Sequence, residues 1–166
     1  MAYDVIVVGG GPAGLTAALY AARAGRSVLV LEGASTGGQI QYAPLVENYP
    51  GMPAMAGSQF AENLSAQAEG LGVTVEYAAV QGFHPTEGGY AVEAEEGTWT
   101  GRALVLSPGA SHRPLGLPGE AELLGAGVSY CAICDGAFYA GKRVAVVGGG
   151  DTALQDALFL SEVCAQ

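Results

Sequence analysis

Two cysteines and an aspartate stand close together near the end of the sequence. The segment reads Cys131-Ala-Ile-Cys134-Asp135. Two thiols at this spacing, at the start of a helix, can close a disulfide with little backbone movement, and a helix start stabilises the thiolate. Asp135 can move protons when the dithiol opens and closes. The pattern predicts thiol–disulfide redox chemistry with Cys131, Cys134 and Asp135 as the catalytic residues.

A zinc site and an inert pair of buried thiols are the two alternatives for this cysteine pair. A zinc ribbon needs a second pair of ligands. Cys164 stands alone further on, and His84 and His112 lie upstream in what reads as another part of the fold. We therefore expect no metal, and we assign Cys164 to packing within a helix.

A glycine-rich turn near the start of the sequence has the spacing of a dinucleotide site. The segment Gly9-Gly-Gly11-Pro12-Ala13-Gly14 fits the pattern G-x-G-x-x-G between an apolar strand and a helix. Gly9 allows the tight turn, Gly11 lets the backbone approach a pyrophosphate, and Gly14 lets the helix pack on the sheet. The N–H groups at the helix start then face the phosphates.

An acid follows this turn where a ribose would need one. Glu32 ends the second apolar strand, and a carboxylate there accepts hydrogen bonds from ribose hydroxyls. A glycine-rich turn of another α/β fold is the alternative. The first 32 residues therefore predict a βαβ unit that holds the ADP half of a dinucleotide, and by spacing alone that dinucleotide is NAD or FAD.

A second fingerprint stands near the end of the sequence. Gly148-Gly-Gly150-Asp151-Thr152-Ala153 fits the variant G-x-G-x-x-A, again between an apolar run and a helical pattern. A purely structural strand–helix turn is the alternative here. The acid or arginine that completes such a site is expected after the next strand, past residue 166, so this site is predicted to be incomplete in the sequence given.

The apolar runs around these motifs predict an α/β fold. A parallel Rossmann-type sheet with a β-meander is expected first, followed by the truncated start of a second Rossmann-type unit. Residues 33–53 read as a long ordered loop and 114–119 as a linker. The predicted strands are 3–8, 27–31, 73–80, 90–95, 98–102, 103–107 and 143–147, and the predicted helices are 12–24, 59–69, 131–138 and 151–163.

Composition excludes several classes of protein. The 166 residues hold 16 Asp and Glu against six Lys and Arg, and the six are scattered, so a nucleic-acid partner is rejected. No apolar run reaches the roughly 18 residues that a membrane span needs. The start of the sequence lacks the pattern of a signal peptide, and we expect a cytoplasmic protein.

Two fingerprints with a C-x-x-C-D segment between them form a specific combination, and here the sequence resembles the low-molecular-weight thioredoxin reductases over essentially its whole length. Cys131–Gly136 is the most discriminating match. The matching segments are Val8–Leu15, Gly37–Ile40, Val46–Gly51, Gly127–Gly136 and Val146–Ala153. The resemblance identifies FAD as the dinucleotide of the first site and NADPH as that of the second.

The resemblance also implies roles for individual residues. Electrons would pass from NADPH to FAD, to the cysteine pair, and on to a disulfide of a thioredoxin-like protein. Cys134 would be the thiol beside the flavin, Cys131 the thiol that attacks the partner, and Asp135 the proton donor and acceptor. The residues implied to bind FAD are Gly9, Gly11, Pro12, Ala13, Gly14, Glu32, Gly38, Gln39, Asn48 and Gly109; those implied to bind NADPH are Gly148, Gly150, Asp151, Thr152 and Ala153.

The resemblance further implies two domains that swing against each other. Residues 1–113 would be the first segment of the FAD-binding domain, residues 114–166 the beginning of the NAD(P)H-binding domain with the redox cysteines, and 114–119 one hinge strand. The sequence departs from the family at Ser107-Pro-Gly-Ala110, where Ala-Thr-Gly-Ala is common, and it stops before the rest of both domains.

Two classes of function are consistent with the sequence. The first is a flavin-dependent disulfide reductase, with the flavoprotein that reduces a peroxidase as a close variant. The second is a non-enzymatic fragment that at most binds FAD. We expect the isolated 166 residues to be inactive, because both nucleotide sites are incomplete. The sequence does not fix NADPH against NADH, the partner protein or the oligomeric state, a homodimer included.

Overall fold

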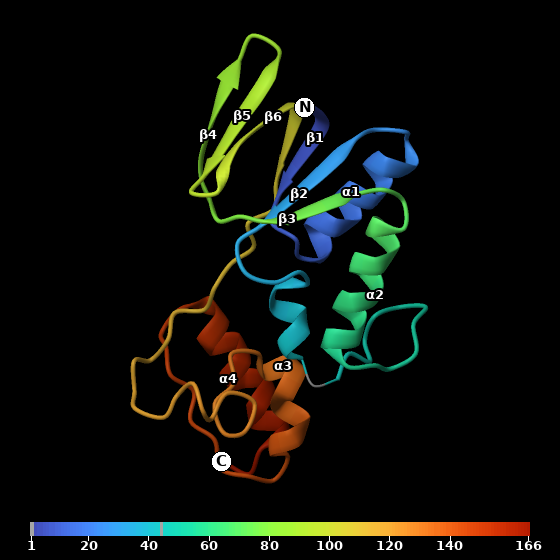
Figure 1. Ribbon diagram of the computed structural model, residues 1–166. Helices are drawn as coiled ribbons and strands as arrows, with labels where there is room; N and C mark the ends of the chain where they lie inside the picture. Colours follow the sequence, from blue (N-terminus) through green and yellow to red (C-terminus); the bar gives the residue numbers. More distant parts are fainter. Residues whose placement is uncertain (1, 44) are drawn as a thin grey trace. The chain divides into compact units, whose positions relative to one another are not determined.

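The computed structural model describes residues 2–43 and 45–166 and divides the chain into two compact units, Met1–Ala110 and Ser111–Gln166. The first unit holds β1 (Tyr3–Val8), α1 (Pro12–Arg23), β2 (Val28–Glu32), the 3-10 helix η1 (Gly38–Tyr42), α2 (Gly57–Glu69), β3 (Thr74–Tyr77), β4 (Val80–Thr86), β5 (Gly89–Ala94) and β6 (Gly97–Leu106) (Figure 1). The second unit holds α3 (Ala132–Asp135), the 3-10 helix η2 (Gly136–Tyr139) and α4 (Asp151–Val163).

The first unit is built on one six-stranded sheet. The strand order is β3-β2-β1-β6-β5-β4. Strands β1, β2, β3 and the end of β6 run parallel, whereas β4, β5 and β6 form an antiparallel meander. The predicted Rossmann-type sheet with a β-meander is therefore confirmed.

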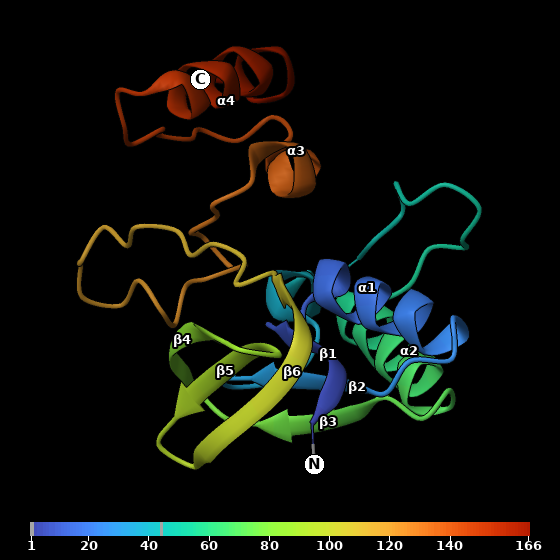
Figure 2. The ribbon, with the colours of Figure 1, turned by 90° about the horizontal axis from the view of Figure 1, so that it is seen from above.

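Strands β1 and β2 are covered on both faces. Val7 and Val30 pack with Leu15 of α1 and Ala68 of α2 on one face. On the other face the residues that pack together come from β1, β2 and the meander, and they include Ile6, Leu29, Leu31, Val92 and Trp99. Figure 2 shows α1 and α2 on one side of these strands and the meander on the other. Burial on both faces explains why residues 5–8 of β1 and 28–31 of β2 are unbroken apolar runs.

Strand β6 serves both parts of the sheet because it changes partner at Gly101. This residue pairs with Tyr3 of β1 and with Tyr90 of β5. A Cβ at Gly101 would lie 2.8 Å from a side-chain carbon of Ile6, so only glycine lets the strand pass this close. The sequence predicted two strands, 98–102 and 103–107, where the chain forms one bent strand.

Helix α1 starts and stops where its sequence predicts. Pro12 takes the first helical position, where its missing N–H costs nothing. Gly25, with φ +73°, follows the last turn, and the N–H of Arg26 donates to the carbonyl of Ala21. This is the glycine-terminated end that closes many helices.

Three sequence predictions for the first unit are wrong in detail. The predicted strand 73–80 is divided at Ala78 between β3 and β4, because β3 pairs with β2 while β4 turns away to pair with β5. Residues 81–86 of β4 were not predicted. The predicted loop 33–53 contains η1, whose turn is bonded by the N–H of Ala43 to the carbonyl of Ile40.

In the second unit the helix α4 is confirmed, but the strand predicted at 143–147 is wrong. The described residues give that segment no sheet partner. Its first residues instead meet the end of the chain, where the N–H of Val144 donates to the carbonyl of Gln166. Val147 is 69% exposed. An apolar run becomes part of a sheet only where a neighbouring strand pairs with it, and no such strand is present among the described residues.

No helix in the described part of the chain is long and apolar enough to cross a membrane.

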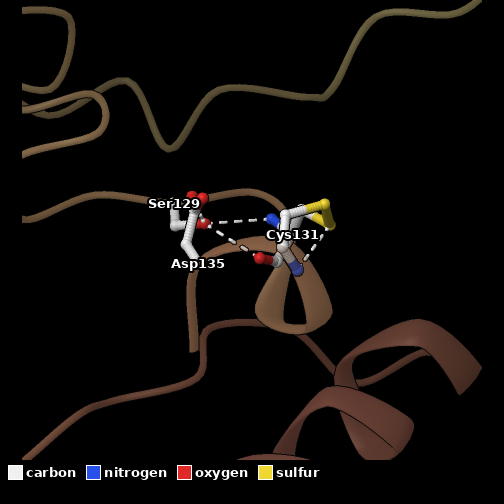
Figure 3. Close-up of a disulfide and its surroundings, with 4 residues drawn as sticks. Ser129, Cys131 and Asp135 are labelled. Atoms are coloured by element: carbon white, nitrogen blue, oxygen red, sulfur yellow. Dashed lines mark hydrogen bonds between the residues drawn. A yellow bond between two sulfur atoms is a disulfide. The ribbon is translucent and has the colours of Figure 1, made fainter. Parts of the chain in front are cut away.

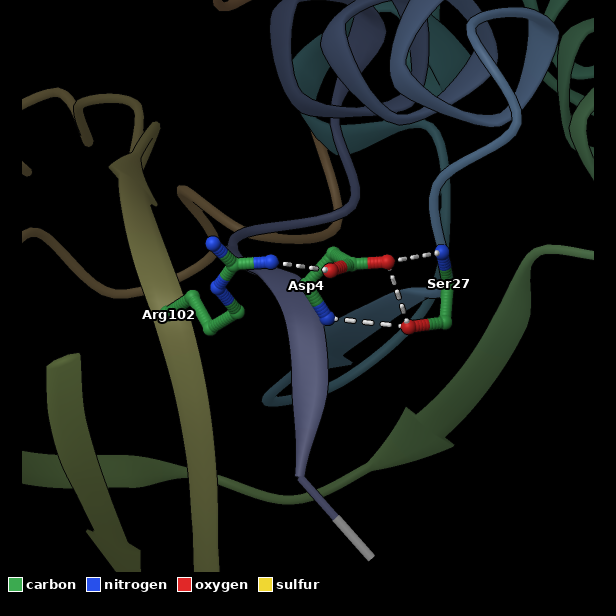
Figure 4. Close-up of polar contacts among 3 residues, drawn as sticks. All are labelled: Asp4, Ser27 and Arg102. Carbon is green, nitrogen blue, oxygen red and sulfur yellow. Dashed lines mark hydrogen bonds and ion pairs between the residues drawn. The ribbon is translucent and has the colours of Figure 1, made fainter. Parts of the chain in front are cut away.

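A polar cluster fastens the N-terminal ends of β1 and β2. The Asp4 Oδ2 accepts hydrogen bonds from the Ser27 N–H (3.0 Å) and the Ser27 hydroxyl (3.1 Å), and Arg102 lies 3.4 Å from its other oxygen (Figure 4). The hydrogen bond from the Ser27 backbone, then that from its hydroxyl, and more weakly the Arg102 charge hold the pKa of Asp4 below its usual range. The folded state therefore favours the ionised carboxylate.

We predict that this cluster makes the first unit more stable above about pH 4 than below it. A carboxyl whose pKa is lowered by folding contributes stability above its unfolded pKa, and that contribution disappears as the pH falls through the folded value. Asp4→Asn should therefore reduce the urea-unfolding free energy at neutral pH, and the difference from wild type should shrink on acidification. Glu96→Gln, at an exposed hairpin position, is the control; a pH-independent difference for Asp4→Asn would contradict the prediction.

Candidate active site and cofactor sites

The predicted cysteine pair is a disulfide in the structure. Cys131 and Cys134 are bonded through their sulfurs, with their Cα atoms 5.3 Å apart across one turn. The Cys134 N–H donates to the Cys131 sulfur at 3.2 Å (Figure 3). Cys134 is exposed and Cys131 half-buried. The disulfide is thus accessible, and its Cys131 sulfur accepts a backbone hydrogen bond.

Asp135 is held by a serine that the sequence reasoning missed. The Ser129 hydroxyl donates to the Asp135 Oδ2 at 2.6 Å and accepts the Cys131 N–H at 3.1 Å. The Asp135 N–H also donates to the Cys131 carbonyl at 3.0 Å. The three predicted catalytic residues therefore belong to one hydrogen-bonded turn. The sequence does contain a signal for this contact: a serine two residues before a cysteine that starts a helix is a spacing typical of local serine turns.

The first glycine fingerprint lies where β1, α1 and the end of β6 meet. A Cβ on Gly14 would overlap the Gly9 carbonyl oxygen and lie 2.6 Å from the Ser107 Oγ. Gly9, with φ +100°, would overlap the Ser107 carbonyl oxygen in the same way. Ser107 donates its N–H to the Val8 carbonyl at 2.8 Å, and its hydroxyl lies 2.9 Å from the same oxygen. The roles predicted for Gly9 and Gly14 in turning and packing are met by this geometry.

The departure from the family at Ser107 has a structural consequence that the sequence did not reveal. The Ser107 hydroxyl oxygen lies 3.1 Å from the Gly9 carbonyl oxygen and 2.9 Å from the Val8 carbonyl oxygen. Both carbonyls stand at the end of β1, where the strand ladder stops. The serine therefore supplies the hydrogen bonds that fix the entry to the glycine turn.

Glu32 contacts the glycine turn itself. Its Oε2 accepts the Gly10 N–H at 2.7 Å, and its Oε1 accepts the Ala34 N–H at 2.9 Å. The Gly37 N–H donates to the Gly10 carbonyl at 2.8 Å. Since a carboxylate offers about four acceptor positions, these two bonds orient Glu32 and leave room for ribose hydroxyls.

Gly11 stands at the open side of this turn. A Cβ there would meet no atom nearer than the Gly38 Cα at 3.9 Å. Gly11 comes directly before α1, whose first backbone N–H groups have no partner within the helix. The space in front of Gly11, the helix start and the oriented Glu32 fit the pyrophosphate and ribose of a dinucleotide.

Only some of the other predicted FAD contacts lie near the first fingerprint. Gly38 lies against Gly11, and the Gln39 side-chain amide donates to the carbonyl of Ala110, next to Gly109. Asn48 is exposed in the loop after η1, and no hydrogen bond among the described residues joins it to the fingerprint. Its predicted contact stays a prediction.

The second fingerprint lies at the start of α4. Gly148, with φ +145°, would place a Cβ 2.9 Å from that of Ala153, whereas Gly149 and Gly150 face open space. A cleft of about 830 Å³ within the second unit is lined by Gly150, Asp151, Thr152 and Ala153 and also by Ser129 and Asp135. Of the three predicted catalytic residues, only Asp135 lines this cleft with the second fingerprint; Cys131 and Cys134 do not.

In the described part of the chain, no cluster of three or more His, Cys, Asp or Glu side chains could hold a metal ion.

Comparison with known proteins decides the family. The model of the pyridine nucleotide-disulphide oxidoreductase family matches residues 3–166. The chain belongs to this family. It is similar to thioredoxin reductase from Treponema pallidum (44% identical over 162 residues, covering 97% of this chain and 53% of the relative) and to the bifunctional thioredoxin reductase/thioredoxin from Mycobacterium leprae (47% over 165 residues, 96% and 35%).

A solved structure agrees with these sequence relatives. The crystal structure of thioredoxin reductase from Streptococcus pyogenes MGAS5005 matches with a TM-score of 0.90 and 39% identity, and the match covers 98% of this chain and 53% of that one. The chain spans about half the length of the relatives it matches.

A carboxylate orders the predicted linker of this chain. Glu120 accepts hydrogen bonds from the N–H groups of Leu115 (2.8 Å), Gly116 (2.8 Å) and Leu117 (3.3 Å) and from the Tyr130 hydroxyl. The Tyr130 hydrogen bond, followed by that from Leu115, holds the pKa of Glu120 below its usual range, and the pKa of Tyr130 is raised by the same bond. Residues 114–119, predicted as a hinge strand, are therefore fastened to the residue before Cys131.

We predict that a methyl group added at Gly14 lowers the stability of the chain far more than one added at Gly11. Gly14→Ala forces overlap with backbone that cannot move away, and we expect it to lower the unfolding free energy by about 3 kcal/mol or more. Gly11→Ala meets open space at an ordinary backbone conformation, so the loss should be about 1 kcal/mol or less. Thermal and urea unfolding measure both, and equal losses would refute the packing argument.

Proposed function

We propose that this chain carries the FAD fingerprint and the redox turn of a flavin-dependent disulfide reductase that passes electrons from NADPH to a thioredoxin-like protein. The observation that carries the proposal is the accessible Cys131–Cys134 disulfide, joined through Ser129 to Asp135. Membership of the pyridine nucleotide-disulphide oxidoreductase family and the two fingerprints support it. The cytoplasmic location stays a prediction.

The first fingerprint is the proposed FAD site. Gly11 leaves the backbone open to a pyrophosphate, and Glu32 is held by Gly10 and Ala34 in an orientation that can accept ribose hydroxyls. Gly38 completes the same rim of the turn. A bound flavin supplies the electron pair that opens the disulfide. The residues of this chain bind and orient it.

The second fingerprint is the proposed NADPH site. Gly149 and Gly150 leave open space before α4, and the first turn of this long helix offers N–H groups to phosphates. Gly148 holds the turn tight against Ala153. Asp151 and Thr152 line the same cleft as Ser129 and Asp135, which supports a nucleotide site in the unit that carries the redox turn.

The disulfide and its neighbours account for the transfer to the partner. Two electrons and two protons convert the Cys131–Cys134 disulfide to a dithiol. The Cys131 thiolate then attacks one sulfur of the partner disulfide and forms a mixed disulfide, and the other partner sulfur leaves as a thiolate. Cys134 attacks Cys131, the second partner thiol leaves, and the protein disulfide is restored. Asp135 takes up and returns the protons of the chain's own thiols.

Thioredoxin is the proposed partner because of the names that the relatives carry. The Treponema pallidum and Bacillus subtilis relatives are thioredoxin reductases, at 44% and 41% identity. The Mycobacterium leprae relative is a bifunctional thioredoxin reductase/thioredoxin. These names support a protein disulfide as the electron acceptor of this chain.

We predict that the FAD assignment can be tested at Gly11 without loss of the fold. The product of the whole reading frame that contains this chain should purify with flavin absorbance, and Gly11→Ala should lose it because the methyl group occupies the place of the pyrophosphate. Gly88→Ala is a matched control, since its Cβ meets nothing within 4 Å and that of Gly11 only the Gly38 Cα at 3.9 Å. A Gly11→Ala protein that keeps its flavin would overturn the assignment.

For the same full-length protein we predict that Cys131→Ser separates two half-reactions. NADPH should still bleach the flavin absorbance, while reduction of oxidised thioredoxin falls by about 100-fold or more because the attacking thiolate is gone. Cys164→Ser should match wild type. Full activity of Cys131→Ser with thioredoxin would remove the cysteine pair from the reaction.

A further inference from the structure

One hydroxyl connects the cysteine pair to its acid. Ser129 accepts the Cys131 N–H at 3.1 Å and donates to the Asp135 Oδ2 at 2.6 Å. Its oxygen also lies 3.3 Å from the Cys131 carbonyl, which is the weaker of its two donor contacts. Figure 3 shows the serine on the side of the turn where the Asp135 carboxylate lies, with the sulfurs at the other side.

The serine is what fixes the carboxylate. The backbone of the turn is already closed by the Asp135 N–H on the Cys131 carbonyl and the Cys134 N–H on the Cys131 sulfur. Among the described residues, the only hydrogen bond made by the Asp135 carboxylate is that from Ser129. Asp135 is half-buried rather than enclosed, so packing alone does not hold its side chain in one orientation.

We propose that Ser129 is a positioning residue for dithiol–disulfide exchange, acting through Asp135. It holds the carboxylate in one orientation relative to Cys131, so that the acid is in place when the thiols lose and regain protons. A group that must rotate into position for each transfer loses the advantage of a fixed geometry. This inference rests on the proposed function, because it needs Asp135 to serve the cysteine pair.

The test uses this chain alone and needs no bound nucleotide. The chain is prepared in a Cys164→Ser background, reduced with dithiothreitol and freed of it. It is then mixed in a stopped-flow instrument with the aromatic disulfide dye dithiobis(nitrobenzoate). One dithiol and one dye molecule yield the Cys131–Cys134 disulfide and two coloured thiolates, with two protons released, so the electrons balance without another reactant.

Ser129→Ala should slow this exchange by about tenfold, which is less than the roughly 100- to 10,000-fold that a positioned acid or base contributes, because the carboxylate remains and only its fixed orientation is lost. Ser129→Thr keeps the hydroxyl and should restore the rate to within about twofold of wild type. Ser161→Ala is the matched control, since this serine bonds only within α4, to the Leu158 carbonyl. Circular dichroism and complete re-formation of the disulfide establish that each variant is folded.

A double-mutant cycle decides whether the serine works through the acid. In an Asp135→Asn background, Ser129→Ala should cause no further slowing, because the group that it positions no longer carries protons. Independent slowing by the two changes would show that Ser129 merely supports the turn and would overturn the inference. So would a Ser129→Ala rate equal to wild type, or an Asp135→Asn rate equal to wild type.

Failure of the proposed function gives a different result. In that case Cys131→Ser would leave thioredoxin reduction by the full-length protein intact, whatever Ser129 does to the dye reaction.

Discussion

The first unit depends on the crossing of three backbone segments that leaves no room for a side chain at Gly9 or Gly14. The end of β1, the first turn of α1 and the end of β6 meet at Gly9, Gly14 and Ser107, at distances where a single Cβ would overlap a carbonyl. The Ser107 N–H and hydroxyl satisfy the carbonyls at the end of β1. Because the backbone segments touch directly here, the contact fixes the direction in which α1 leaves the sheet. It thereby also fixes the position of the unpaired N–H groups in the first turn of α1.

The same crossing orders the segments around it. Glu32 reaches the turn from the end of β2, and Gly37 reaches it from the loop before η1. Both bonds go to Gly10, one to its N–H and one to its carbonyl. Gly10 thus holds at one turn both Glu32, the predicted ribose ligand, and Gly37, which directly precedes the predicted FAD contact Gly38. Such shared hydrogen bonds can make a site rigid even when its residues come from distant stretches of the sequence.

The second unit is organised by side-chain hydrogen bonds more than by a packed core. Helix α4 has no buried residue, and the apolar run before it lies outside any sheet of the described residues. Glu120 accepts hydrogen bonds from the backbone N–H groups of residues 115–117 and from the Tyr130 hydroxyl. Ser129 hydrogen-bonds to Cys131 and Asp135 in the redox turn. Such a unit is ordered locally by satisfied polar groups, whereas the apolar side chains of Val147, Leu154 and Leu158 are exposed.

The sequence by itself determined the local features of this protein. Strand β1, helices α1 and α4 and the cysteine pair were predicted because apolar period, caps and residue spacing are properties of short segments. Tertiary structure decided what depends on distant neighbours: that 143–147 forms no strand, that β6 is one strand that changes partner at Gly101, and that Glu32 and Asp135 are already hydrogen-bonded. A strand needs a partner and a carboxylate needs a donor, and neither is encoded within the segment that requires it.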